Sequence, residues 1–275
     1  MLDVMRATLP AALLGAVAKC AGLAGRYWRV CATGLSFALF GIGGVLLRVL
    51  VFPFLSLIAA GPARTRAARA VIQASLRAFV ATMRALGVLR YDVSGLEKLD
   101  RTGLLILANH PTLIDTVFLI AFVRNASCVV KGALWRNPVT AGPVRAAAYI
   151  KNDQGPALIA DCVATLRAGG NLIVFPEGTR SAPGRPITLK RGAANIAVRA
   201  AQAVTPVVIS CLPPTLAKGD KWWQVPSRRA CFRIDVMDDI GMDAFIGGGI
   251  SDVMAARRLT EHLQNFFLEE GRRHA

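Results

Sequence analysis

Uncharged apolar sequence dominates the first third of the chain. Residues 30–47 carry no charge, and after Arg48 the chain is uncharged again over residues 49–63. A helix that spans a bilayer needs about 20 apolar residues, so the first run is close to that length, whereas Pro53 interrupts the second. The two runs predict a helical hairpin or re-entrant pair over residues 30–63 that dips into a bilayer, with Arg48 reaching the interface. A single spanning helix and a buried hairpin of a soluble protein are the alternatives.

The charge distribution indicates an anionic membrane as the partner of this region. The chain has 33 Lys and Arg against 17 Asp and Glu, a formal net charge of +16, and every charged residue between Asp3 and Asp92 is basic. Basic residues flank the apolar runs on both sides, which places both flanks in the cytoplasm by the positive-inside rule. Nucleic-acid-binding proteins rarely carry such apolar runs, so no nucleic-acid partner is expected. The sequence predicts the inner (cytoplasmic) membrane, with any active site facing the cytoplasm.

Residues 64–90 repeat apolar side chains at helical spacing, while the arginines of this segment fall largely on other faces. The pattern predicts a basic amphipathic helix that lies at the membrane surface, packs on a globular domain, or does both. Residues 1–90 are therefore predicted to form a membrane-associated helical region. The apolar positions of the predicted helix are Ile72, Leu76, Phe79, Val80, Met83 and Leu86.

The hydrophobic pattern of the sequence changes at Tyr91, where short apolar runs begin to alternate with stretches of helical periodicity. This alternation is typical of α/β folds. It predicts an α/β domain over residues 91–275, with a mixed, mostly parallel sheet flanked by helices. The expected strands are residues 104–108, 128–130, 171–175, 204–210 and 231–236, and the expected helices are residues 112–122, 138–147, 156–168, 190–203 and 252–269.

The six cysteines are scattered through the chain and include no CxxC pair. Closely spaced cysteines that could bind a metal or carry redox chemistry are therefore not indicated. We expect the cysteines to be buried free thiols. We expect neither a metal nor a cofactor.

The first chemical motif is NHPTLID, residues 109–115, which follows the expected strand 104–108. Pro111 suits the first position of a helix, so His110 is expected at the helix cap. His110 and Asp115 do not share a face of a regular helix. They can meet only if His110 has non-helical dihedral angles and folds back over the first turn. Asp115 would then fix the imidazole tautomer and leave the other ring nitrogen as a base, although a purely structural cap explains the same pattern.

The second motif is FPEGTRS, residues 175–181, at the end of the expected strand 171–175. A turn with glycine exposes backbone amides, and the guanidinium group of Arg180 offers a fork that suits phosphate. The alternative is a structural turn in which Arg180 and Glu177 pair with each other.

Together the two motifs resemble the signature of the glycerolipid acyltransferase (HX4D) family, which includes the lysophosphatidic acid acyltransferases. The resemblance covers roughly residues 91–215. It implies His110 as general base and Asp115 as its partner. It also implies that the turn formed by Glu177, Gly178, Thr179 and Arg180 is part of the site for the acceptor phosphate.

Two further basic residues enter through this resemblance. Lys190 precedes the helix expected at residues 190–203 and could add positive charge near the acceptor. Many members of the family have an Ile-Asp-Arg segment between the two motifs. Here the usual arginine falls on Asn152, with Lys151 beside it. A lysolipid without a phosphate at that position is therefore an alternative acceptor.

The implied reaction transfers an acyl chain from a thioester of acyl carrier protein or coenzyme A to the free hydroxyl of a lysolipid. The default acceptor is 1-acylglycerol-3-phosphate, and the product is then phosphatidic acid. A lyso-ornithine lipid or another specialised lysolipid is the alternative acceptor. A non-catalytic membrane-binding protein is the alternative of a different class, and it explains the basic, apolar N-terminal region but not the two motifs.

Overall fold

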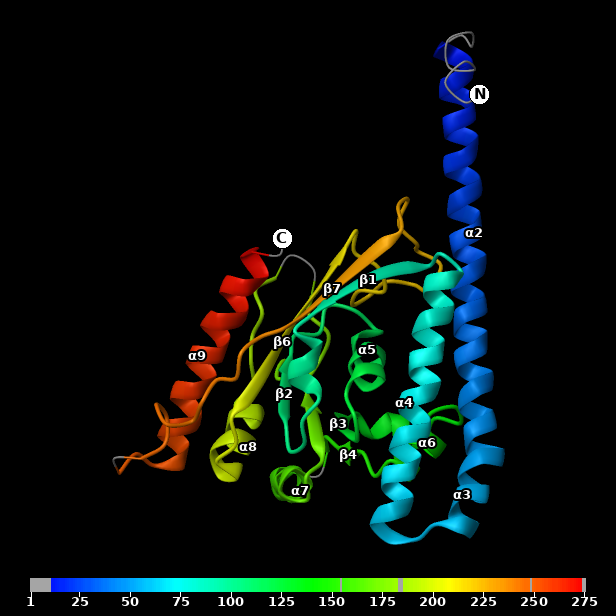
Figure 1. Cartoon of the computed structure of the whole chain (residues 1–275). Coiled ribbons are helices and arrows are strands. Elements are labelled where there is room, and N and C mark those ends of the chain that lie inside the picture. Colours follow the sequence, from blue (N-terminus) through cyan, green and yellow to red (C-terminus); the bar gives the residue numbers. More distant parts are fainter. Residues whose placement is uncertain (1–10, 154, 183–184, 248, 274–275) are drawn as a thin grey trace.

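The computed structural model describes residues 11–153, 155–182, 185–247 and 249–273 (Figure 1). Residues 1–10, which the sequence analysis assigns to the membrane-associated region, lie outside the described residues.

A seven-stranded sheet forms the centre of the structure, in the order β1-β7-β6-β2-β5-β3-β4. β6 and β7 are antiparallel, and the other neighbouring pairs are parallel. The predicted mixed, mostly parallel sheet is therefore confirmed. The strands are β1 (Leu89–Ser94), β2 (Leu105–Ala108), β3 (Ala126–Val130), β4 (Ile150–Lys151), β5 (Asn171–Val174), β6 (Val204–Leu212) and β7 (Ala230–Val236).

Helices cover both faces of the sheet (Figure 1). The alternation of side chains along β2 explains why, because Ile106 and Ala108 enter one buried cluster while Leu105 and Leu107 enter another. The first cluster packs under α4 (Gly61–Ala85), α5 (Asp115–Phe122) and α6 (Ala141–Ala146), and the second under α7 (Pro156–Arg167), α8 (Gly192–Ala200) and α9 (Asp252–Arg273).

All five expected strands are present, with small differences at their ends. The sequence analysis missed β1 and β4. β4 is only two residues long, so no apolar run marks it. The helix expected from Thr112 begins at Asp115 instead, since residues 111–114 form a turn.

The hairpin expected over residues 30–63 is replaced by one long helical run. α2 (Ala11–Leu46) continues through a π-helical turn, η1 (Leu47–Val51), into α3 (Phe52–Ile58). Pro53 does not end the run. It lies in the first turn of α3, directly after the π-helical turn η1. The chain reverses just afterwards, and α4 begins at Gly61 and returns beside α2 (Figure 1). The hairpin is therefore formed by α2–α3 and α4.

Arg48, which the sequence places at the membrane interface, is exposed and also contacts the domain. Its guanidinium Nη1 donates to the carbonyl oxygen of Pro138 at 3.0 Å, and its side-chain stem lies against Gly142 of α6. Arg48 therefore joins the helical run to the domain. α4 packs on the domain as well, since Ile72, Val80 and Met83 belong to the buried core.

The outward face of the helical run is apolar. The helix over Gly22–Ile58 is long and apolar enough to cross a membrane, and only 6% of its most apolar window is buried. Exposed apolar residues recur on it at intervals of three and four, as on one helix face. We call this face the apolar stripe. It consists of Leu35, Leu39, Ile42, Leu46, Leu50, Phe54 and Leu57, of which Leu39 and Leu46 also line the cavity described below.

The packing of α9 yields a stability prediction. Leu263 of α9 is 1% exposed inside the second cluster. Leu263→Ala should cost about 2–5 kcal/mol and lower the midpoint of thermal unfolding by about 4–20 °C. Val253→Ala on the same helix removes an exposed side chain and should change the midpoint by about 2 °C or less. Equal midpoints for the two variants would contradict the packing of α9.

Candidate active site

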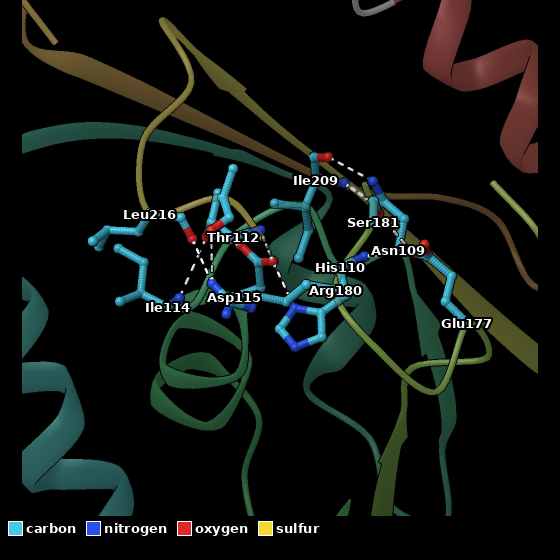
Figure 2. A network of polar contacts seen from close by, with 11 residues as sticks. Asn109, His110, Thr112, Ile114, Asp115, Glu177, Arg180, Ser181, Ile209 and Leu216 are labelled. Carbon is cyan, nitrogen blue, oxygen red and sulfur yellow. Dashed lines mark hydrogen bonds and ion pairs between the residues drawn. The ribbon is translucent and has the colours of Figure 1, made fainter. Parts of the chain in front are cut away.

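Both sequence motifs lie at the same edge of the sheet. β2 and β5 are parallel neighbours, so the residues that follow them, His110 and the turn 175–181, come together there. Ligands of open α/β sheets bind outside the carboxyl ends of the strands. The edge where the two motifs meet is therefore the place to look for a reaction site (Figure 2).

The His110 ring meets the Asp115 carboxylate, with 2.8 Å between Nδ1 and Oδ2. The cap geometry that the sequence predicts is wrong in one respect, since the helix begins at Asp115 and not at Pro111. The intervening turn is what brings the two side chains together. Thr112 holds this turn, because its backbone N–H donates to Asp115 Oδ2 at 2.7 Å and its hydroxyl to Oδ1 at 2.5 Å (Figure 2).

The Asp115 carboxylate is completely buried. Burial raises the pKa of Asp115, while the hydrogen bonds from His110 and Thr112 act in the opposite direction. An ionised carboxylate only accepts hydrogen bonds, so Nδ1 of His110 carries the proton and Nε2 keeps its lone pair. The pair can therefore provide a base at Nε2.

The His110 ring is also fixed from its flat side. It stacks on Phe175 with ring centroids 4.2 Å apart and an interplanar angle of 24°. Its side chain is 16% exposed and lines the large cavity described below. The ring is thus held in one orientation with a route to a ligand.

Glu177 of the second motif accepts hydrogen bonds from residues of both motifs. Its Oε1 accepts from the backbone N–H of His110 and from the hydroxyl of Ser181, both at 2.9 Å. The backbone N–H of Ser181 donates in turn to the carbonyl oxygen of His110 at 2.8 Å. Burial raises the pKa of Glu177, and these hydrogen bonds oppose the shift. The Glu177 carboxylate therefore positions the His110 backbone. The sequence predicted Glu177 only as part of the acceptor phosphate site.

Gly178 forms the bend of the second motif with a φ of +71°, a left-handed conformation that favours glycine. A Cβ added at Gly178 would lie 3.0 Å from the ammonium nitrogen of Lys190. The backbone N–H of Lys190 donates to the carbonyl oxygen of Pro176 at 2.8 Å. The structure therefore brings Lys190 to the turn, as the sequence predicts.

Arg180 and Thr179 both line the cavity. Arg180 does not pair with Glu177. Its Nη1 donates to the carbonyl oxygens of Leu216 at 3.0 Å and of Ala217 at 2.9 Å. Arg180 thus connects the second motif to the segment between β6 and β7, while its guanidinium group remains in the cavity wall.

Lys151 lies elsewhere. Its ammonium group sits over the ring of Trp135, 4.6 Å from the centroid, and Lys151 is not among the described residues that line the cavity. Asn152 does line it, together with Lys131 and Lys218, which the sequence analysis missed. Lys131 directly follows β3, a parallel neighbour of β5, so its position after a strand was the signal that could have found it.

The cavity itself has a volume of about 920 Å³. His110 and Arg180 line its polar end, whereas α2, α4, α5 and the loop before α6 supply mainly apolar side chains. These include Phe40, Leu76 and Val117. Apolar clefts of this size with a few polar groups are typical of sites for small organic ligands.

Comparisons with known proteins show which sequences and folds this chain is similar to. Residues 90–210 match the model of a protein family described as Acyltransferase. The chain is 31% identical over 148 residues to a 1-acyl-sn-glycerol-3-phosphate acyltransferase of Pseudomonas aeruginosa, covering 50% of this chain and 56% of that protein. It is 25% identical over 127 residues to the chloroplastic 1-acyl-sn-glycerol-3-phosphate acyltransferase LPAT1 of Arabidopsis thaliana, covering 44% and 36% of the two chains.

Residues 90–210, less than half of the chain, are thus similar to this family of acyltransferases. The chain spans 56% and 36% of the lengths of these two relatives. The fold extends further than the sequence match. The crystal structure of the 1-acyl-sn-glycerophosphate (LPA) acyltransferase PlsC from Thermotoga maritima superposes with a TM-score of 0.65 at 21% identity, covering 89% of this chain and 98% of that one.

The role of a nucleophile does not fit Cys211. Cys211 is the thiol whose charge interacts with Asp115, and burial raises the pKa of Cys211 to about 12. A thiol with so high a pKa stays protonated at neutral pH and is a poor nucleophile. Cys211 is therefore not a candidate nucleophile at this edge of the sheet.

The turn at Gly178 gives a testable prediction for the stability of the domain. Gly178→Ala forces a left-handed conformation on alanine, which costs about 1–2 kcal/mol and should lower the unfolding midpoint by about 2–8 °C. Gly192→Ala is the matched control, because a Cβ there meets no atom within 4 Å and Gly192 lies at the start of α8. Differential scanning calorimetry of both variants measures the difference. A Gly192→Ala midpoint as low as that of Gly178→Ala would contradict the proposed strain.

Proposed function

We propose that this chain is an O-acyltransferase that moves an acyl chain from a thioester to the free hydroxyl of a lysolipid. The acceptor we propose is 1-acylglycerol-3-phosphate, with phosphatidic acid as the product, and the donor is acyl carrier protein or coenzyme A. The proposal rests on the contact between His110 and Asp115, in which Nδ1 and Oδ2 are 2.8 Å apart. The His110 ring of this pair lines a large, mainly apolar cavity. The names of the relatives support the same acceptor.

His110 is the general base in the proposed mechanism. The acceptor hydroxyl donates to Nε2, and its oxygen attacks the thioester carbonyl carbon as the proton moves to the ring. Asp115 stabilises the imidazolium that forms. The tetrahedral intermediate then breaks its carbon–sulfur bond, and the ring returns the proton to the leaving thiol. A positioned base of this kind contributes about 10²–10⁴-fold to the rate.

The reaction needs no protein nucleophile and no cofactor, because the thioester is already an activated acyl group. Binding contributes the rest, since holding two reactants in register supplies up to about 7–11 kcal/mol. The apolar part of the cavity supports this role. It can hold a hydrocarbon chain between α2 and α4 while the reacting carbonyl remains beside His110.

The acceptor headgroup would lie among the cations at the edge of the sheet. Arg180, Lys131 and Lys218 line the cavity, and Lys190 reaches the Gly178 turn. Arginine and lysine together suit a phosphate monoester. Asn152 is the observation that favours a second acceptor class, a lysolipid without phosphate such as a lyso-ornithine lipid, because it places a neutral amide in the cavity wall.

The apolar stripe supports a membrane location for this reaction. A face of this kind, with basic residues nearby, is typical of helices that lie in the plane of a membrane surface. The stripe belongs to the same helical run as cavity residues Phe37 and Leu47. An acceptor could therefore reach His110 from the lipid without crossing water. We propose that the membrane is the inner membrane and that the site faces the cytoplasm.

The base role predicts a specific loss of activity. His110→Ala should abolish transfer, and Asp115→Asn should lower kcat by about 10²–10⁴-fold, because an amide can hold the ring in the wrong tautomer. The assay is release of free thiol from an acyl thioester in the presence of lysolipid. His262→Ala, on α9, should leave the rate unchanged. Transfer by His110→Ala at a near-natural rate would rule out the base role, and thiol release without an acceptor would indicate a thioesterase.

Lys131 follows β3, and Lys151 lies in the neighbouring strand β4. Lys131 lines the cavity, whereas Lys151 is not among the described residues that do. Lys131→Ala should raise the apparent KM for 1-acylglycerol-3-phosphate by about tenfold, the value of one lost charged hydrogen bond. Lys151→Ala should leave the KM unchanged, since its ammonium group lies over Trp135. A panel of phosphate-bearing and phosphate-free lysolipids, with products detected by mass spectrometry, measures both effects. The opposite order of KM values would contradict the assignment of Lys131 to the acceptor site.

A further inference from the structure

The connection between β6 and β7, residues 213–229, leaves the sheet and lies against α2. The ring of Trp222 lies 3.1 Å from the position of a Cβ at Gly34, and its centroid is 6.3 Å from that of Phe37. Further along, the guanidinium group of Arg29 donates to the carbonyl oxygen of Ser227. The connection and this part of α2 therefore form one continuous surface.

Two neighbouring tryptophans of this connection are exposed. Trp222 is 43% exposed and Trp223 is 49% exposed, with their rings edge to face at a centroid distance of 5.6 Å. The ammonium group of Lys221 lies 5.2 Å from the centroid of the Trp223 ring. Clustered exposed aromatic side chains are unusual on a surface that faces only water, and they mark interaction sites.

α2 adds two more aromatic residues beside the connection. Tyr27 is 71% exposed and Trp28 is 56% exposed, and the indole N–H of Trp28 donates to the carbonyl oxygen of Leu86 at 2.9 Å. Exposed basic residues surround these rings, whereas Asp220 is the one acidic residue of the connection. We call this surface the aromatic–basic belt, and it consists of Arg26, Tyr27, Trp28, Lys218, Lys221, Trp222, Trp223, Arg228 and Arg229.

We propose that the aromatic–basic belt binds the headgroup region of an anionic lipid bilayer and is a second membrane anchor beside the apolar stripe. Tryptophan and tyrosine prefer the membrane–water interface, where the ring is partly apolar and the N–H or O–H stays hydrated. Lysine and arginine near anionic headgroups complete the match in charge. The belt adjoins the stripe along α2, which carries Arg26, Tyr27 and Trp28 of the belt as well as the first four residues of the stripe. The proposal rests on the membrane association proposed above.

The belt is joined directly to the reaction site. Leu216, at the start of the connection, accepts a hydrogen bond from Arg180 through its carbonyl oxygen and another from the backbone N–H of Leu113 at 3.0 Å (Figure 2). Lys218 lines the cavity while it also belongs to the belt. A bilayer bound at the belt would therefore hold the polar end of the cavity at the depth of the lipid headgroups, where a lysolipid hydroxyl lies.

Tryptophan fluorescence tests this placement in the full chain. The chain has four tryptophans, so replacing Trp28, Trp135 and Trp222 by phenylalanine leaves Trp223 as the reporter. The vesicles contain equal parts of phosphatidylcholine and phosphatidylglycerol. On binding, the Trp223 emission should shift to shorter wavelength, and phosphatidylcholine brominated near the top of its acyl chains should quench most of it.

A matched reporter on the far side of the domain is the control. Adding Trp223→Phe and Val253→Trp moves the tryptophan to an exposed position on α9, which lies on the opposite side of the sheet from α2 (Figure 1). This chain lacks all three tryptophans of the belt, so it should float less well, and the part that floats should show no quenching. The proposal is overturned if Trp223 stays unquenched on floated chain, if both reporters are quenched equally, or if the natural chain does not float. Thiol release measures acyl transfer separately, so the two proposals fail independently.

A second variant tests the charge of the belt without touching a tryptophan. Lys221→Gln with Arg228→Gln should lower the partition coefficient onto the anionic vesicles by about fivefold for each charge removed. Binding to vesicles of phosphatidylcholine alone should be unchanged. Arg258→Gln removes an exposed charge from α9 and should have no effect on either vesicle. An equal decrease in the partition coefficient for Arg258→Gln and for the belt variant would show that only net charge matters. That result would overturn the specific role of the belt.

Discussion

The hydrogen bond between His110 and a completely buried Asp115 is the interaction on which the rest of the site depends. A buried carboxylate is costly unless it is satisfied, and here the imidazole and both donors of Thr112 satisfy it. The requirement fixes the turn 111–114 and, with it, the direction of the ring. The Asn109 side chain adds a second constraint, since its amide exchanges two hydrogen bonds with the backbone of Ile209 in β6.

Parallel strands turn two distant motifs into one site. β2 and β5 end at the same edge, and Glu177 then ties the second motif to the His110 backbone. The helices contribute the apolar part, because α2 and α4 close a cavity that begins at the imidazole. The same helical run carries the outward apolar stripe. The same few elements therefore carry the His110–Asp115 pair, the apolar cavity and the exposed apolar stripe, which suits the proposed reaction of a membrane lipid.

The sequence predicted features that local patterns determine, and it failed where distant residues decide. The strands before both motifs follow from short apolar runs. The sequence predicted that His110 meets Asp115 only if His110 folds back over the first turn, and the turn 111–114 brings the two side chains together. The continuous helix through Pro53 was missed, because proline reads as a break unless it occupies the first turn of a new helix. The hydrogen-bond partners of Arg180 could not be predicted from the sequence, because the carbonyl oxygens of Leu216 and Ala217 come from a distant part of the chain. Lys131 was overlooked although its position after a strand was visible.

The central claim is that Asp115 holds the His110 ring with Nδ1 protonated and Nε2 free to accept a proton. Nitrogen-15 NMR of histidine-labelled protein at neutral pH tests it most directly, with His110→Asn used to assign the signal. The structure predicts one fixed tautomer for His110, protonated at Nδ1 and not at Nε2, and loss of that preference in Asp115→Asn. A ring protonated at Nε2, or one that averages between tautomers in the natural protein, would contradict the account.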